Sequence, residues 1–254
     1  MKRLIGAVLF GTVLFTVGCS IQLYQIVTAP QHRITPHEWY LNYYHPVSLF
    51  WTEDFVAEWF QVKDGFDDND LPAYSDFHGR YYTFEHGYRV VPNVPSDYRR
   101  TVWLFGNSTT ADYFVPDNLT YAAQLQRLVR NDSTRVVNRG TSGQVVEQEL
   151  LRLRLSHIKP GDIVVFLDGY MDLSPDQPTR IDVTQYLHFV EQASLYSLSH
   201  GAAFYHFVQP CRHPLSLPSF IVVPTDVYFD DSHVDERGDA LIARAIYDAI
   251  APEF

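Results

Sequence analysis

The most informative part of this 254-residue sequence is Thr101-Val-Trp-Leu-Phe-Gly-Asn-Ser-Thr-Thr110. Its four apolar residues from Val102 to Phe105 have the composition of a buried strand, and Gly106 allows a sharp turn after it. Ser108 follows on that turn, at the carboxyl end of a strand, where open α/β sheets bind their ligands. The stretch therefore predicts a strand that presents a serine in the position of a nucleophile.

A second segment, Phe229-Asp-Asp-Ser-His233, contains the other groups that a nucleophilic serine needs. A hydroxyl is a weak nucleophile at neutral pH, so an imidazole must accept its proton, and a carboxylate commonly holds that imidazole in one tautomer. His233 and Asp230 match these two roles. The alternative is that Ser108 caps a helix and that the Asp-Asp-Ser-His run is a solvated loop.

Beyond Thr101, apolar runs alternate with amphipathic segments, a pattern typical of a parallel sheet with crossover helices. The predicted strands are 101–105, 135–138, 162–167 and 203–208, with a weaker one near 220–223. The predicted helices are 121–129, 145–156, 183–200 and 240–250.

Together these segments resemble the SGNH hydrolases, the GDSL-like esterase superfamily, over residues 101–250. In the first block, Asn107 stands where the family often has the aspartate of Gly-Asp-Ser. The second block, Val136-Val-Asn-Arg-Gly-Thr-Ser-Gly143, contains Gly140, which matches the family glycine whose backbone N–H helps to form the oxyanion hole. The resemblance implies that the N–H groups of Ser108 and Gly140 both serve as oxyanion donors.

The third block, from Pro160 to Asp172, resembles the family's strand that ends in Asp-Gly-x-Asn-Asp, but Met171 stands at the asparagine position. In the family that asparagine donates a hydrogen bond to the oxyanion, and a thioether has no proton to donate. Losing one such donor costs about 2.7–4 kcal/mol of transition-state stabilisation. This is the departure that bears most directly on activity.

The resemblance implies a three-layer α/β/α sandwich with a five-stranded parallel sheet, of flavodoxin-like type. It also implies ester chemistry without a cofactor or metal, in which Ser108 attacks an acyl carbonyl and His233 acts as base and then as acid. Asp230 would orient His233 in preference to Asp231, because the family motif places the carboxylate three residues before the histidine. The expected substrate is an acylated carbohydrate or a small ester, with hydrolysis or acyl transfer as the outcome.

Two alternatives from other classes remain open. The first is a catalytically impaired member that binds a glycan or a partner in envelope polysaccharide assembly, with Met171 as the sign of decay. The second, weaker alternative is a metal phosphoesterase that uses Asp168, Asp172, Asp230 and His233.

The amino terminus predicts export. Lys2 and Arg3 precede an apolar run that ends at Gly18-Cys19, which has the form of a secretory signal. The ending resembles a bacterial lipobox, in which Cys19 would be lipidated, although Thr16 replaces the usual leucine. An uncleaved membrane helix that continues to Ala29 competes with this interpretation. Both place the protein in a bacterial cell envelope, anchored to the membrane and facing the periplasm or the exterior.

Composition limits the partners and the organisation. The net charge of −11 argues against nucleic acid as a partner. We expect an anchor or signal segment at 1–29, an irregular, aromatic-rich extension at 30–100 that packs on the catalytic domain, and an SGNH-like domain at 101–254. Aromatic residues make up 15% of the chain, and between Trp39 and Tyr98 most are expected to pack, with one or two lining a carbohydrate cleft. The acidic run at 65–70 is interpreted as a solvated loop.

Overall fold

The computed structural model of the chain describes residues 35–42, 48, 50–129 and 133–254. The predicted anchor segment at 1–29, with Cys19, lies outside the described residues and stays a prediction. Residues Pro36–Phe254 form one compact unit. Within the described ranges, no helix has both the length and the apolar composition needed to cross a membrane.

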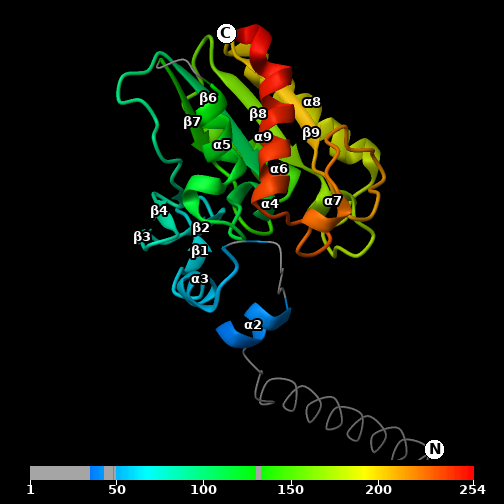
Figure 1. The fold of residues 1–254 in the computed structure, drawn as a ribbon. Helices are drawn as coiled ribbons and strands as arrows, with labels where there is room; N and C mark the ends of the chain where they lie inside the picture. The colour runs from blue at the N-terminus through cyan, green and yellow to red at the C-terminus, as the bar shows by residue number, and fades with distance from the viewer. Residues whose placement is uncertain (1–34, 43–47, 49, 130–132) are drawn as a thin grey trace, which may run out of the picture. The chain divides into compact units, whose positions relative to one another are not determined.

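A parallel sheet lies at the centre of the fold, with the strand order β7-β6-β8-β9 (Figure 1). The strands are β6 (Arg100–Gly106), β7 (Thr134–Asn138), β8 (Ile163–Asp168) and β9 (Ala203–Val208). β6 pairs with β7 on one side and with β8 on the other, so that Val102 is opposite both Val136 and Ile163. The four stronger strand predictions are confirmed.

The sheet has four strands among the described residues, and not five, because the weaker prediction near 220–223 was wrong. That segment has no assigned secondary structure and joins no ladder. Pro218 and Pro224 flank it and lack the N–H groups that a sheet strand donates. The N–H of Ile221 instead donates to Ser219 Oγ at 3.1 Å.

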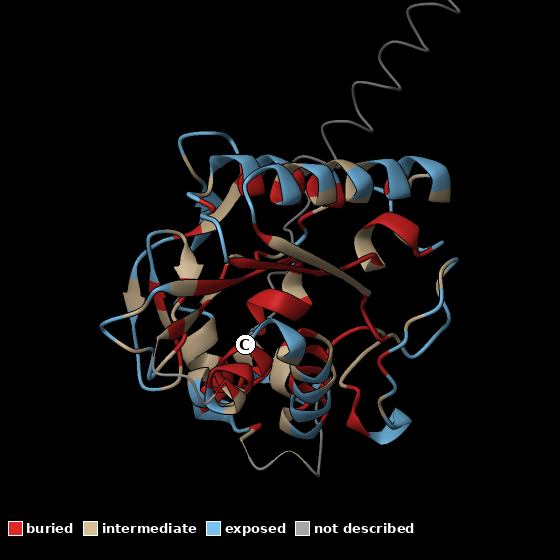
Figure 2. Cartoon of the chain, turned by 90° about the horizontal axis from the view of Figure 1, so that it is seen from above, coloured by how far each residue is buried: buried red, intermediate tan, exposed pale blue. Residues whose placement is uncertain are grey.

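Helices cover both faces of the sheet and complete the predicted three-layer sandwich (Figure 2). On one face, α5 (Tyr121–Leu128) packs against α9 (Glu236–Ile250), and on the other α6 (Val146–Leu155) packs against α8 (Val183–Ser199). Successive side chains of a strand point to opposite faces. Accordingly, Val102 and Leu104 enter the first core, whereas Trp103 and Phe105 enter the second.

The last helix begins at Glu236, four residues before the predicted start at 240. Asp235 is its N-cap, and the side chain accepts hydrogen bonds from the N–H groups of Arg237 and Gly238 at 2.9 and 3.1 Å. These bonds satisfy donors that the first turn of a helix leaves free, which extends the helix toward the loop of His233.

The segment before β6, predicted to be irregular, contains short regular elements. They are α2 (Pro36–Asn42), α3 (Glu53–Trp59), the antiparallel pair of β1 (Asp64–Phe66) and β2 (Pro72–Tyr74), and a three-stranded sheet of β3 (Phe77–His78), β4 (Thr83–Glu85) and β5 (Tyr88–Arg89). These strands have only two or three residues, too few for the sequence to show a period of two.

The aromatic side chains of this segment form a third core together with the residues that follow β6. Trp51, Phe55, Tyr82 and Phe84 are buried in it and pack with Phe114, which follows β6 in the chain. The expectation that most of these aromatics pack is therefore confirmed. The extension and the sheet domain share this core.

Candidate active site

Ser108, His233 and Asp230 form one line of hydrogen bonds beyond the carboxyl ends of the strands. A hydrogen bond of 2.9 Å joins Ser108 Oγ to His233 Nε2, and one of 2.7 Å joins His233 Nδ1 to Asp230 Oδ2. Ser108 begins the one-turn helix α4 (Ser108–Ala111) directly after β6, whereas the other two lie in the loop before α9. The fold thus brings together the serine, the imidazole and the carboxylate that the sequence singled out.

Asp230 is held as an anion. Its Oδ1 accepts hydrogen bonds from the backbone N–H groups of Ser232 and His233, both at 2.8 Å. Burial acts to raise the pKa of this carboxyl, but the hydrogen bonds and the charge of His233 lower it to about 2. An ionised carboxylate only accepts, so His233 Nδ1 carries a proton. In the uncharged form of the imidazole, Nε2 is then the acceptor that faces the hydroxyl of Ser108.

Asp231, the weaker candidate for orienting the base, faces elsewhere. Its Oδ1 lies 3.5 Å from His213 Nε2, and its carbonyl accepts a hydrogen bond of 2.8 Å from the N–H of Arg212. Its side chain is 45% exposed, whereas that of Asp230 is 29% exposed.

The turn that carries Ser108 is fixed by two buried amides, Asn107 and Gln209. Asn107 caps α4, because its Oδ1 accepts the N–H of Thr109 at 3.0 Å, and its Nδ2 donates to Gln209 Oε1 at 2.6 Å. Gln209 Nε2 donates to Thr109 Oγ1 at 3.0 Å, and that hydroxyl donates to the carbonyl of Ser232 at 3.3 Å. Consecutive hydrogen bonds therefore join the turn of the serine to the loop of the imidazole.

Aromatic rings cover the imidazole of His233, which is 9% exposed. The ring of Phe114 stacks on it with centroids 4.5 Å apart and an angle of 26°, and the centroid of Tyr113 lies 5.2 Å away. Phe114 in turn stacks on Trp51 of the extension, at 5.4 Å and 9°. These contacts limit both the rotation of the imidazole and its access to water.

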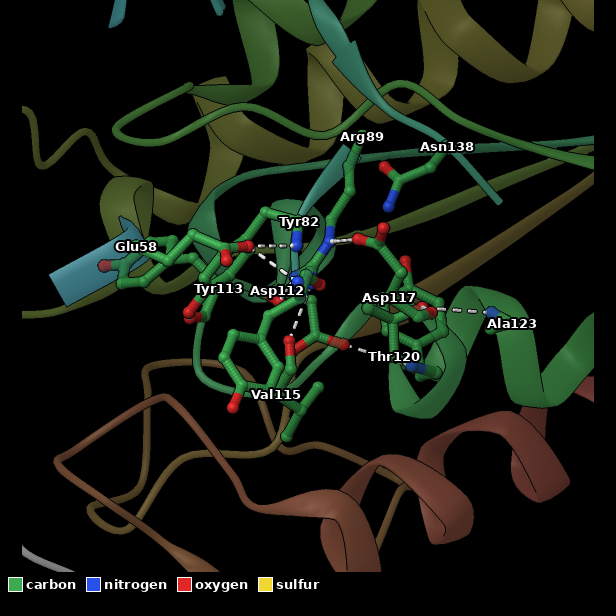
Figure 3. A network of polar contacts seen from close by, with 12 residues as sticks. Glu58, Tyr82, Arg89, Asp112, Tyr113, Val115, Asp117, Thr120, Ala123 and Asn138 are labelled. Atoms are coloured by element: carbon green, nitrogen blue, oxygen red, sulfur yellow. Dashed lines mark hydrogen bonds and ion pairs between the residues drawn. The ribbon is translucent and has the colours of Figure 1, made fainter. Parts of the chain in front are cut away.

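Arg89 of β5 joins the extension to the loop after α4 (Figure 3). The side chain is buried, and it donates to Asp117 Oδ1 at 2.8 Å, to the carbonyl of Val115 at 2.7 Å and to the carbonyl of Asp112. Its guanidinium carbon lies 4.8 Å from the centre of the Tyr82 ring, in a cation–π contact. Asp112 is the C-cap of α4, so Arg89 fixes the far end of the helix that begins with Ser108.

Two buried carboxyl groups belong to neighbouring elements: Asp112 is the C-cap of α4, and Asp239 lies on α9. Burial raises the pKa of Asp112 to about 7, although Arg89 acts to lower it. Burial and the neighbouring Asp112 raise the pKa of Asp239 well above its usual range. At neutral pH the pair therefore keeps at least one proton, because two anions at this depth would repel each other without solvent screening.

Gly140 lies directly against α4. A Cβ at this position would stand 2.5 Å from Thr110 Cβ and 2.6 Å from the nitrogen of Ala111, so only glycine permits the approach. Its N–H donates to Asn138 Oδ1 at 2.8 Å. The N–H predicted as the second oxyanion donor is thus engaged, and it can bind an oxyanion only by exchanging that acceptor. Gly143, with φ +70°, has no atom within 4 Å of its own Cβ position.

Met171 lies on α7 (Tyr170–Leu173), a one-turn helix that follows β8 after Gly169, whose φ is +108°. The carbonyl of Met171 accepts a hydrogen bond of 2.6 Å from Thr179 Oγ1. The side chain of Met171 is a thioether, and it has no proton to donate to an oxyanion.

The two aspartates of the third block have partners that do not include the serine or its base. Asp168 accepts a hydrogen bond from the hydroxyl of Tyr186 and lies 3.2 Å from His206 Nε2. Asp172 accepts the N–H of Val146, at 3.1 and 3.2 Å from its two oxygens. Within the part of the chain that the structure describes, no three histidine, cysteine, aspartate or glutamate side chains are placed to hold a metal ion.

Sequence reasoning missed Gln209, Phe114 and Arg89. Gln209 had a usable signal, because it is the polar residue directly after the apolar run of β9, at the same edge of the sheet as Ser108. Phe114 and Arg89 act through tertiary contacts with distant segments, and their local sequence carries no sign of them.

Comparison with solved structures identifies the fold. A single-residue variant of an acetyl-xylooligosaccharide esterase from Geobacillus stearothermophilus is 16% identical, with 61% of this chain and 95% of that chain covered and a TM-score of 0.50. A member of the lipolytic G-D-S-L family from Veillonella parvula is 14% identical, with 60% and 99% covered and a TM-score of 0.49. The chain has the fold of the SGNH hydrolases. At such identities the likeness concerns the fold alone, so the activity is argued from the site.

No model of a known protein family matches the sequence, and no curated protein matches it.

Proposed function

We propose that this chain is a serine ester hydrolase or acyltransferase of the SGNH type. The observation that carries the proposal is the line of hydrogen bonds from Ser108 through His233 to Asp230, in which the carboxylate is ionised and the base faces the hydroxyl. A nucleophile, its base and an orienting carboxylate are the groups that acyl transfer requires.

In this function Ser108 Oγ attacks the carbonyl carbon of an ester while His233 Nε2 takes the hydroxyl proton. Asp230 stabilises the imidazolium, and the N–H of Ser108 donates to the oxyanion that forms. His233 then returns the proton to the leaving alcohol, which leaves the acyl group on Ser108. Water or a second hydroxyl, deprotonated by His233, attacks this acyl-enzyme and restores the serine. Water gives hydrolysis, and a sugar hydroxyl gives acyl transfer.

The substrate we propose is an O-acetyl or other O-acyl ester on a surface or exported carbohydrate. The signal-like sequence at 1–29 supports a position in a bacterial envelope, with a lipid on Cys19 or an uncleaved helix as the anchor. The acetyl-xylooligosaccharide esterase that shares the fold acts on an acylated sugar, which supports this choice of substrate.

A second candidate function is favoured by the oxyanion positions. Met171 has no proton to donate, and the N–H of Gly140 is engaged by Asn138. A chain with only one free donor would be slow, and its scaffold could instead bind a glycan or a partner in polysaccharide assembly. In that case the hydroxyl of Ser108 would not be needed for function.

Initial rates of ester hydrolysis distinguish the esterase from the non-catalytic binding role. The full chain is assayed on 4-nitrophenyl acetate and on acetylated xylo-oligosaccharides, beside Ser108→Ala. Ser199→Ala is the matched control, since this exposed serine ends α8, before the amino end of β9. The proposal expects Ser108→Ala to abolish turnover while the control keeps it. Equal rates for Ser108→Ala and the wild type would refute the esterase and favour the binding role.

A further inference from the structure

A cavity of about 330 Å³ opens between the β1–β2 hairpin of the extension and the loop that follows β7. Its lining includes Asp64 and Phe66 on β1, Tyr74 on β2, and Thr141 and Ser142 on the loop. A volume near 300 Å³ is at the lower end of the range for small-molecule sites. None of these residues belongs to the hydrogen-bonded line of Ser108.

The cavity adjoins the turn of the nucleophile. The N–H of Thr141 donates to the carbonyl of Gly106 at 3.2 Å, and Gly106 is two residues before Ser108. Gly140, the residue before Thr141, is in close contact with Thr110 and Ala111 of α4. The loop that lines the cavity is therefore hydrogen-bonded to the backbone that leads to Ser108, on the β7 side of β6.

The lining combines an aromatic face with polar groups. The side chain of Phe66 is 74% exposed although it is a large apolar ring. Tyr74 is buried, and its hydroxyl lies 2.7 Å from Ser142 Oγ and accepts the N–H of Ser142 at 3.0 Å. Burial raises the pKa of Tyr74, so its hydroxyl keeps its proton. A flat apolar face next to hydroxyl groups complements a pyranose ring, which has C–H groups on its faces and hydroxyls at its edge.

The hairpin that carries Phe66 is rigid. Asp67 Oδ1 accepts the N–H groups of Asn69 and Leu71 at 2.9 and 3.1 Å, which closes the turn between β1 and β2. Arg152 of α6 donates to the carbonyl of Pro72 at 2.6 Å and lies 3.5 Å from Asp67 Oδ2. Because Arg152 is buried on a helix of the sandwich, the aromatic face is held in a fixed position relative to the sheet. Such preorganisation lowers the entropic cost of binding.

The charge near the cavity further restricts the class of ligand that can bind there. Asp64 is the one charged side chain among the described residues that line it, and the adjoining turn adds Asp68 and Asp70, whereas Asp67 is paired with Arg152. A carboxylated or sulfated sugar would be repelled here.

We propose that this cavity is a subsite for an uncharged sugar ring of the carbohydrate chain whose ester reacts at Ser108, with Phe66 as the stacking platform. The proposal rests on the esterase function given above and deepens it, because it names the part of the substrate that is held away from the reacting bond.

Kinetics on two substrates test the subsite. Phe66→Ala is compared with the wild type on acetylated xylo-oligosaccharides and on 4-nitrophenyl acetate, which has no sugar. Phe220→Ala is the matched control, because this phenylalanine is 89% exposed and does not line the cavity. We expect Phe66→Ala to raise KM for the oligosaccharide roughly 3- to 10-fold, as the loss of one stacking ring would, with the small ester unaffected. Phe66→Tyr should retain the wild-type KM.

An equal change on both substrates, or no change beyond that of Phe220→Ala, would overturn the subsite. If the wild type hydrolyses neither ester, the esterase proposal fails, and calorimetric titration with unacetylated xylo-oligosaccharides then tests the subsite alone. Binding that Phe66→Ala weakens and Phe220→Ala does not would support it. Absence of binding by the wild type would overturn it.

Discussion

Replacing Asp230 by asparagine tests the proposed role of its carboxylate by itself, because the two side chains have the same shape and only the charge and one acceptor oxygen are lost. In the structure, Oδ1 of Asp230 accepts two backbone N–H groups, from Ser232 and His233, each at 2.8 Å. In the variant the amide oxygen must keep these two bonds, since an NH₂ group cannot accept them. The amide nitrogen then faces His233 Nδ1 in place of Oδ2.

This exchange reverses the tautomer of the base. An amide NH₂ group donates, so His233 Nδ1 must accept and the ring proton moves to Nε2, which then cannot take the proton of Ser108. The variant also loses the negative charge that Asp230 carries beside the imidazole, where its pKa is lowered to about 2. The reversed tautomer and the lost charge together are expected to lower kcat by about 10⁴-fold.

The assay is the kcat for 4-nitrophenyl acetate from pH 6 to 9, with Asp231→Asn as the control. Asp231 is next in sequence and its side chain pairs with His213, so its replacement should leave kcat within about twofold. Thermal unfolding of both variants verifies that they are folded. A loss smaller than about tenfold for Asp230→Asn, or a larger loss for Asp231→Asn, would refute the assignment of the orienting carboxylate.

Four further variants test the surroundings of the site. Gln209→Leu removes both side-chain bonds of a buried amide and leaves their partners unsatisfied, so urea unfolding should show a loss of about 2–4 kcal/mol; a loss below about 0.5 kcal/mol would contradict the network. Met171→Asn adds a side-chain donor at the family's oxyanion position, so kcat for 4-nitrophenyl acetate should rise by at least about tenfold, and an unchanged kcat would contradict that role of the position. Gly140→Ala places a Cβ 2.5 Å from a neighbouring carbon, so its melting temperature should fall more than that of Gly65→Ala, where no atom lies within 4 Å and φ is not positive. Asp112, whose pKa burial raises to about 7, binds more protons folded than unfolded between about pH 4 and 7; wild-type stability should therefore fall as the pH rises through this window, and Asp112→Asn should flatten that fall in urea unfolding at pH 5 and 8.

The elements of the sandwich could be predicted because each is encoded within one short stretch of sequence. The central residues of β6 (102–105) and of β8 (163–167) are all apolar, as expected for strands covered on both faces, and α9 carries an apolar stripe. The candidate nucleophile and base could be found as well, because a parallel sheet places the residues after its strands at one edge. Ser108 and His233 are 125 residues apart, yet hydrogen-bonded.

The oxyanion donors could be predicted from the sequence less completely than the candidate nucleophile and base. A glycine at position 140 fits two physical roles, that of a donor N–H and that of a close contact without a Cβ. The structure gives direct evidence for the second, because Thr110 and Ala111 leave no space for a side chain. Which acceptor its N–H faces depends on the rotamer of Asn138, which no sequence pattern encodes.

The extension is the part that the sequence described least, and the contacts around His233 show why it matters. Trp51 stacks on Phe114, and Phe114 stacks on the imidazole. Arg89 places a buried charge of the extension on the carbonyl groups that follow α4, including that of Asp112. Removing the extension would leave these rings exposed to water and these buried carbonyls without their donor. The position of the proposed base and the far end of α4 therefore depend on the extension, and the sheet domain alone is an incomplete form of the proposed site.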